Sequence, residues 1–259
     1  MLLIVANDLE LVHCVQVAEI AVLPTVRSKP RTARERVRIE LTNEIKDVAR
    51  RHLAEQGSAG LSLRAVAREV GMVSSAVYRY FPSRDDLLTA LIVDAYESLG
   101  MAAVEAERIV PRDDLIGRWM AATRAVRTWA LDRPHEYALI FGSPVPGYEA
   151  PQDTIDPATI VPRLLLDIVT DAVDNGIEVG DRNRRMPAPV RADLRQLRES
   201  AVAGVPDEAL MRALMAWTQL IGAISFELFG HLHNVIFDFA AYFGHQMRIV
   251  GDELGLRQL

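Results

Sequence analysis

Apolar side chains recur at intervals of three and four residues along almost the whole chain, which is the period of an amphipathic α-helix. Pro30 precedes a first helical segment that stops at Gly57. Shorter segments follow over Ser62–Glu69 and about Ser74–Tyr80, and Pro82 ends the third of them. Alternation of apolar and polar residues never extends far enough to indicate a sheet. The pattern therefore predicts an all-α fold.

Longer helical segments fill the rest of the chain. Ser83 has the position of a capping residue for a fourth helix that runs toward Arg108. Further helices are expected at about 113–131, 134–141, 158–175, 189–201, 207–230 and 232–250. The prolines and glycines of residues 142–157 predict a loop, and residues 177–187 are expected to form a surface loop.

These segments predict three parts. Residues 31–82 form a helix-turn-helix domain, and residues 83–259 form a larger helical domain. Residues 1–30 are an extension, expected to be disordered; a short apolar element, or an upstream stretch from a misjudged start codon, are the alternatives.

Charge is distributed unevenly along the 259 residues. The net charge of -6, from 29 basic and 35 acidic residues, argues against a nucleic-acid binder when taken whole. Between Arg27 and Arg84, however, thirteen basic residues face six acidic ones, so this stretch carries +7 and the remainder -13. A basic N-terminal module on an acidic body is the expected arrangement.

The single cysteine, Cys14, excludes a disulfide framework and fits a reducing compartment. No run of about eighteen apolar residues occurs without a charge, so no transmembrane helix and no membrane partner are expected. The apolar stretch at residues 1–6 has no basic segment before it, unlike a secretory signal. We expect a cytoplasmic protein.

The most informative segment is Leu61–Leu88, where a short helix, a glycine turn and a second short helix predict a helix-turn-helix. In that motif the later helix lies in the major groove of DNA. Val73, Val77 and Phe81 recur every four residues and are expected to lock this helix onto the domain core. The residues left to face outward are Ser74, Ser75, Ala76, Arg79 and Tyr80.

The sequences SLRAVAREVG at 62–71 and AVYRYFPSRDDLL at 76–88 resemble the TetR family of transcriptional regulators. The likeness covers about fifty residues, far more than a bare helix-turn-helix pattern. One departure concerns the turn, where the family usually has Gly-Val-Ser and this chain has Gly71-Met72-Val73. The capping serine is thus shifted to Ser74 or lost, which leaves open which side chain reads which base.

The resemblance implies roles toward double-stranded DNA. Base-reading positions are Ser74, Ser75, Ala76, Arg79 and Tyr80, and phosphate-contacting positions are Ser62, Arg64, Tyr78 and Arg84. Arg79 could donate to guanine and Ala76 could meet a thymine methyl. Arg34 and Arg38 belong to a basic arm expected to attract phosphate without reading sequence. The alternative for Tyr78 and Tyr80 is that their rings complete the small core, which for Tyr78 does not exclude a phosphate contact.

For the acidic body, the resemblance implies a ligand-responsive domain that also dimerises. The segment around Trp217 resembles the final-helix motif of a subclass marked by Trp and His-Gly, although Ile221 stands where the histidine would be. The expected dimer interface comprises Leu214, Trp217, Ile221, Ile224, Leu228 and Phe237. The alternative is that these residues belong to a monomer core.

A pocket for a lipophilic small molecule is expected between the body helices. Its proposed lining comprises Trp119, Thr123, Val126, Tyr137, Phe141, Leu165 and Ile168. Each of these could instead be plain core.

An enzyme and a helical interaction protein without an operator are the rival classes. His231, His233 and Asp238 could offer metal ligands, but a third strong ligand at a familiar spacing is lacking, so neither a metal nor another cofactor is expected. The sequence therefore predicts a homodimeric repressor that binds a palindromic operator and is released by a ligand-driven population shift.

Overall fold

The computed structural model describes residues 32–179, 185–201 and 205–258. The helices are α1 (Ala33–Gln56), α2 (Leu63–Glu69), α3 (Ser74–Val77), α4 (Arg84–Arg108), α5 (Leu115–Asp132), α6 (Pro134–Phe141), α7 (Ile155–Ala158), α8 (Ile160–Asp174), α9 (Ala188–Ala201), α10 (Asp207–Leu228) and α11 (Phe239–Glu253), with short 3₁₀ turns η1 (Ser58–Gly60) and η2 (Gln152–Thr154). The described residues contain no β-strand, which confirms the all-α prediction. The extension at 1–30 lies outside them.

Side-chain caps explain where several helices start. Thr32, Ser62, Ser83, Asp114 and Asp238 each accept a hydrogen bond from the backbone N–H three residues onward. Such caps satisfy donors that a helix leaves open at its first turn.

Three expected boundaries were wrong. The third helix ends at Val77, and the next residues form turns. The last helix begins at Phe239 rather than near 232, because Gly230 and Asn234 adopt positive φ angles and keep the preceding segment out of helical geometry. The expected 142–157 loop contains η2, and α7 begins at Ile155 within its last residues.

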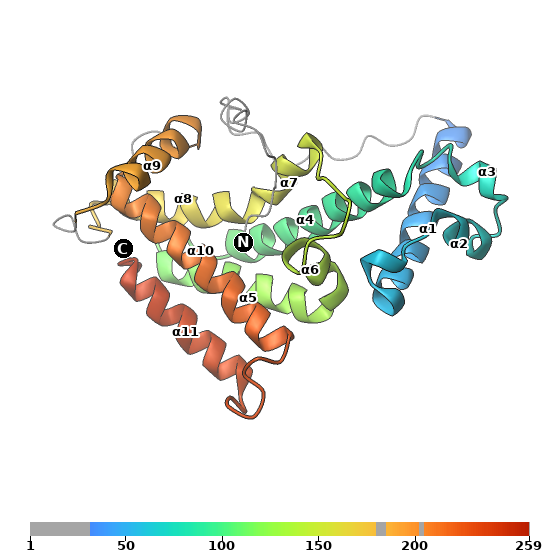
Figure 1. The fold of residues 1–259 in the computed structure, drawn as a ribbon. Coiled ribbons are helices and arrows are strands. Elements are labelled where there is room, and N and C mark those ends of the chain that lie inside the picture. Colours follow the sequence, from blue (N-terminus) through green and yellow to red (C-terminus); the bar gives the residue numbers. More distant parts are fainter. Residues whose placement is uncertain (1–31, 180–184, 202–204, 259) are drawn as a thin grey trace.

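Two hydrophobic cores share one long helix. The N-terminal core, built around Ile45, Val66 and Val77, also includes Leu87 and Leu91 of α4. It therefore extends past the boundary expected at residue 82. The body core is built from the rest of α4 together with α5, α8, α10 and α11. Figure 1 shows α1–α3 at one end, with α4 running from them into the body. Helix α4 is thus the continuous connection between the cores.

Two helices, α4 and α10, are long and apolar enough to cross a membrane by length and composition alone. Here both are core helices: α4 packs against α5 and α8, and α10 packs against α8 and α9.

Candidate nucleic-acid interface and junction cavity

The turn between α2 and α3 is fixed by backbone hydrogen bonds and by burial. The Gly71 N–H donates to the Arg68 carbonyl, and the Met72 N–H donates to the Ala67 carbonyl over 2.8 Å. Gly71 has a φ of 76°, a left-handed conformation that glycine adopts without strain. Val77 is fully buried, so α3 is held onto the N-terminal core.

The outward face of α3 is the surface that sequence reasoning assigned to DNA. Ser74, Ser75 and Arg79 are exposed, and Ala76 is half-buried. In the described chain, Arg79 is in none of the ion pairs found. Hydroxyls on an exposed short helix, with a guanidinium in the turn that follows it, are groups that can hydrogen-bond to base edges in the major groove.

The expectation for the position of Val73 was wrong. It was expected to lock α3 onto the core, yet 71% of its surface is exposed, while Val77 and Phe81 are buried. Val73 is the N-cap of α3 and makes no side-chain capping bond. The four-residue spacing failed here because the helix starts one residue later and Val73 has extended backbone angles. An isopropyl group therefore stands on the exposed surface where a capping hydroxyl is usual.

The two tyrosines of this segment lie in different surroundings. Tyr78 is 42% exposed, so its ring is not part of the core. Tyr80 is half-buried and packs against the N-terminal core, with the Arg38 guanidinium 6.0 Å from its ring centroid. The core interpretation thus describes Tyr80 better than Tyr78. The cation–π contact places Arg38 beside the α3 face.

Arg84, expected to contact phosphate, braces the backbone around the start of α2. Its guanidinium donates to the Ser58 carbonyl over 2.7 Å and to the Leu61 carbonyl over 3.2 Å, and it pairs with Asp85. Ser62 uses its hydroxyl to accept from the Ala65 N–H, while the Arg64 and Arg34 side chains are exposed. The resemblance could not reveal the brace, because it depends on where two carbonyls lie.

Charged residues also connect the N-terminal helices to the body. Lys46 of α1 lies 2.8 Å from Asp94 of α4, and Arg50 lies 2.6 Å from the same carboxylate. Arg50 also lies 3.8 Å from Glu136 of α6. We call Lys46, Arg50, Asp94 and Glu136 the junction ion cluster. Sequence reasoning missed it because its acidic members, Asp94 and Glu136, lie more than forty residues along the chain from Lys46 and Arg50.

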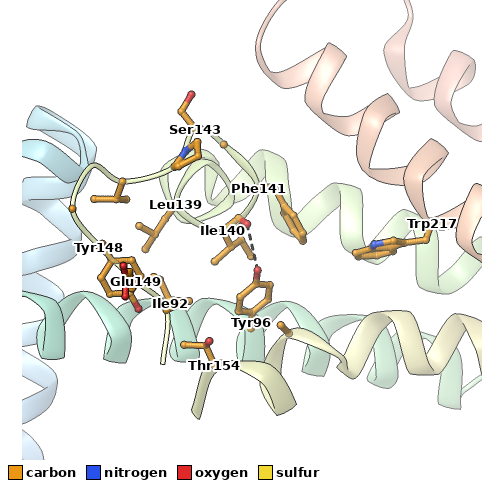
Figure 2. Close-up of a pocket in the computed structure, with 16 residues that line it drawn as sticks. Ile92, Tyr96, Leu139, Ile140, Phe141, Ser143, Tyr148, Glu149, Thr154 and Trp217 are labelled. Atoms are coloured by element: carbon orange, nitrogen blue, oxygen red, sulfur yellow. Dashed lines mark hydrogen bonds between the residues drawn. The ribbon is translucent and has the colours of Figure 1, made fainter. Parts of the chain in front are cut away.

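A cavity of about 410 Å³ lies at the same junction, and we call it the junction cavity (Figure 2). It is lined by Ile92, Tyr96, Leu139, Ile140, Phe141, Gly142, Ser143, Pro144, Val145, Gly147, Tyr148, Glu149, Ala150, Thr154, Ala158 and Trp217. These residues come from α4, α6, the segment that follows α6, α7 and α10.

Of the seven expected lining residues, only Phe141 lines the junction cavity. The other six, Trp119, Thr123, Val126, Tyr137, Leu165 and Ile168, are buried in the body, which agrees with the alternative that they are core. Helical periodicity identifies the face of a helix that turns inward. Periodicity does not show where a loop keeps two inward faces from packing together, and so it cannot locate a cavity.

Hydrogen bonds hold the walls of this cavity. The Tyr96 hydroxyl donates to the Ile140 carbonyl over 3.3 Å, and the Tyr148 hydroxyl lies 2.9 Å from the Thr89 hydroxyl. Burial raises the pKa of Tyr96 to about 12 and also raises the pKa of Tyr148. Both phenols are therefore neutral at physiological pH, and each links the segment around α6 to α4.

The residues expected at a dimer interface divide into two groups. Trp217, Ile221 and Ile224 are buried within the protomer, so the interface assignment is wrong for these three. Leu214 and Phe237 are exposed, and Leu228 is half-buried. The inward and outward faces of α10 are both apolar, so periodicity alone could not separate them.

Exposed apolar side chains also occur on both α10 and α11. Met215 and Phe226 are exposed on α10, and Tyr242 and Ile249 on α11. A Cβ added to Gly222 would meet no atom within 4 Å. We call these five residues the α10–α11 stripe.

Within the described residues, no group of three or more His, Cys, Asp or Glu could hold a metal ion.

The geometry defines a helix-turn-helix protein with a helical body, and comparisons identify its family. The model of bacterial regulatory proteins of the tetR family matches residues 45–91, and the tetracyclin repressor-like C-terminal domain matches residues 119–250. The HTH-type transcriptional regulators Rv1816 of Mycobacterium tuberculosis and Mb1846 of Mycobacterium bovis are each 39% identical over 227 residues, covering 86% of this chain and 94% of theirs. The chain belongs to the TetR family of transcriptional regulators, which are not enzymes.

Solved structures agree with this assignment. The crystal structure of SCO4313 is 37% identical, has a TM-score of 0.70 and covers 85% of this chain and 98% of its own. FadR from Bacillus subtilis, in complex with stearoyl-CoA, has a TM-score of 0.60 at 12% identity, with 82% and 98% covered. At that identity, FadR supports the fold alone.

Proposed function

We propose that this regulator binds a palindromic operator as a homodimer and represses transcription until a small lipophilic ligand occupies the junction cavity. One observation carries the coupling between ligand and DNA. Leu139, Ile140, Val145 and Tyr148 line the cavity and also pack against the N-terminal core. A molecule that displaces these side chains therefore acts on the DNA-binding domain through direct contacts.

The DNA contacts follow from the exposed groups of α3 and its neighbours. Ser74, Ser75 and Arg79 are the proposed base readers, with Ala76 and the edge of Tyr80 beside them. Val73, absent from the sequence-based set, joins them because its methyl groups are exposed. The proposed phosphate contacts are Ser62, Arg64, Tyr78, Arg34 and Arg38, while Arg84 acts mainly as a brace.

A second copy of the chain is the proposed partner of the α10–α11 stripe. Gly222 leaves room for a partner helix to approach closely, and exposed Phe226 and Tyr242 supply apolar area. Two helices from each protomer would form a four-helix interface with twofold symmetry. Such symmetry matches a palindromic operator, in which two recognition helices enter successive major grooves.

Release is proposed to work by a population shift. The dimer is proposed to exist in two states that differ in the spacing of the two recognition helices, and the ligand stabilises the state that gives it the larger cavity. The ligand can shift the equilibrium between these states only by the difference between its affinities for them. The structure of FadR with stearoyl-CoA supports the general point that this fold can hold a lipophilic ligand.

The test of DNA binding compares two arginine variants. Arg79→Ala removes the proposed base reader, and Arg195→Ala removes an exposed arginine of α9, on the body. In gel-shift titrations with a selected operator, we expect Arg79→Ala to lose about 10- to 100-fold in affinity. Arg195→Ala should bind like the unaltered protein, and equal affinities for both variants would refute the assignment.

A further inference from the structure

The side chains that line the junction cavity carry negative charge but no positive charge, which limits the charge that its ligand can have. Among the described residues that line it, Glu149 carries the one charge, and the lining includes no Arg, Lys or His. Glu149 is exposed, and no ion pair found in the described chain involves it. An anionic head group inside this cavity would lose hydration without meeting a counter-charge, which is costly.

The remaining polar side chains of the wall are neutral, and three of their hydroxyls, those of Tyr96, Tyr148 and Thr154, are in hydrogen bonds. The Tyr96 hydroxyl donates to the Ile140 carbonyl, and the Thr154 hydroxyl donates to the Pro151 carbonyl. Each oxygen still has a lone pair with which to accept a hydrogen bond. The lining also holds two donors, the Trp217 indole N–H and the Ser143 hydroxyl, and neither is in a hydrogen bond found in the described chain. Discrimination against a carboxylate therefore depends on the lack of a cationic side chain in the lining and on the negative charge of Glu149.

Aromatic rings form the inner side of the cavity. Phe141 lies edge-on to Tyr96 and to Trp217, with ring centroids 6.0 Å apart in both pairs. Figure 2 shows Phe141 and Trp217 together at one end, and Tyr148 and Glu149 at the other. Aromatic faces bind flat apolar groups and also attract cations. The two ends thus favour a ring at the Trp217 side and a donor or positive charge toward Glu149.

We propose that the junction cavity binds a lipophilic aromatic molecule that is neutral or positively charged, and that it rejects anions such as carboxylates and phosphate-bearing thioesters. This inference rests on the proposed ligand-released function and specifies the ligand class. Glu149 is the residue that favours a cation over a neutral molecule of the same shape. Phe141 and Trp217 provide the affinity common to both.

Three naphthalene probes of nearly equal shape test the charge rule: naphthalenemethanol, naphthylmethylamine as its cation, and naphthoate. Isothermal titration of the full-length protein at pH 7 measures the affinity of each. We expect the amine and the alcohol to bind at least tenfold more tightly than naphthoate. Tightest binding of naphthoate, or no binding of amine and alcohol at millimolar concentration, would overturn the proposal.

Two variants locate the binding. Glu149→Gln should remove the preference for the amine over the alcohol and leave the affinity for the alcohol unchanged. Ala158→Phe places a ring in the cavity and should weaken both probes at least tenfold, while its circular dichroism and operator affinity report whether it is folded. Unchanged probe binding by a folded Ala158→Phe protein would contradict the site.

A gel shift with the same probes separates this inference from the proposed function. Probe binding that follows the charge rule but leaves the operator bound would support the ligand class and argue against release by the cavity. Operator release by naphthoate, with no release by the amine, would contradict the charge rule while preserving ligand control.

Discussion

Arg50 of α1 and Asp94 of α4 form an ion pair of 2.6 Å across the junction between the DNA-binding domain and the body. Lys46 shares the same carboxylate at 2.8 Å, and the Lys46 and Asp94 side chains are only 12% and 17% exposed. Removing one member of a partly buried ion pair leaves the other charges without compensation. The junction ion cluster therefore fixes how α1 meets α4.

Asp94→Asn tests this connection. We expect a loss of about 1–3 kcal/mol in the free energy of unfolding measured by urea, because Lys46 and Arg50 lose the negative charge that they share. Asp47→Asn is the matched control, since Asp47 also pairs with Arg50 but is 62% exposed. Its cost should be below about 1 kcal/mol. If both variants lose the same free energy of unfolding, the ion pair at the junction contributes no more to stability than an exposed ion pair does.

Val73→Ser should separate stability from DNA binding. Serine supplies the N-cap that α3 lacks, so we expect a gain of about 0.5–1 kcal/mol in the free energy of unfolding. Operator affinity should fall, because an apolar contact is lost. Val73→Thr, which caps but keeps one methyl, should gain stability and retain more affinity. A Val73→Ser protein with undiminished operator affinity would remove Val73 from the interface.

Arg84→Lys distinguishes the brace from a phosphate contact. Lysine keeps the charge but cannot bridge the Ser58 and Leu61 carbonyls as the guanidinium does. We expect the melting temperature of Arg84→Lys to fall, and the slope of log affinity against log salt to stay unchanged even in Arg84→Ala, which removes the charge. A slope reduced by about one unit in Arg84→Ala, at unchanged stability, would instead indicate a direct phosphate contact.

Phe226→Asp tests the α10–α11 stripe. A buried carboxylate without a partner should weaken dimerisation by about 2 kcal/mol or more, roughly thirtyfold. Light scattering across a dilution series measures the change. Met101→Asp is the control, because Met101 is similarly exposed but lies on α4. If Met101→Asp dissociates the dimer and Phe226→Asp does not, the interface lies elsewhere.

The contribution of Tyr137 to stability should depend on pH in the alkaline range. Burial raises the pKa of Tyr137 to about 12, and its hydroxyl contacts the Ile221 carbonyl and the Ser225 hydroxyl. Because the folded pKa exceeds the unfolded one, the stabilisation is fully present below pH 10 and is lost as pH rises toward 12. Tyr137→Phe should unfold more easily at pH 7 but lose less additional stability over that range, as measured by urea denaturation at each pH.

Local signals in the sequence predicted most of the helices, because capping residues such as Ser62 and Ser83 and turn residues such as Gly71 act within a few positions. The cavity could not be predicted in this way. Its shape depends on the segment after α6 standing off Tyr96 and Ile92, a relationship between residues far apart in the chain. The outward position of Val73 was missed because Val73 is the N-cap of α3 and has extended backbone angles, so the helical spacing that relates it to Val77 does not apply.

The central claim is that a twofold dimer reads an operator through α3. Selection of bound sequences from a random DNA pool tests it most directly. We expect a palindromic consensus whose half-site centres lie about 10 base pairs apart or a multiple of that, and which Arg79→Ala fails to enrich. Absence of enrichment by the unaltered protein, or an asymmetric consensus still selected by Arg79→Ala, would contradict it.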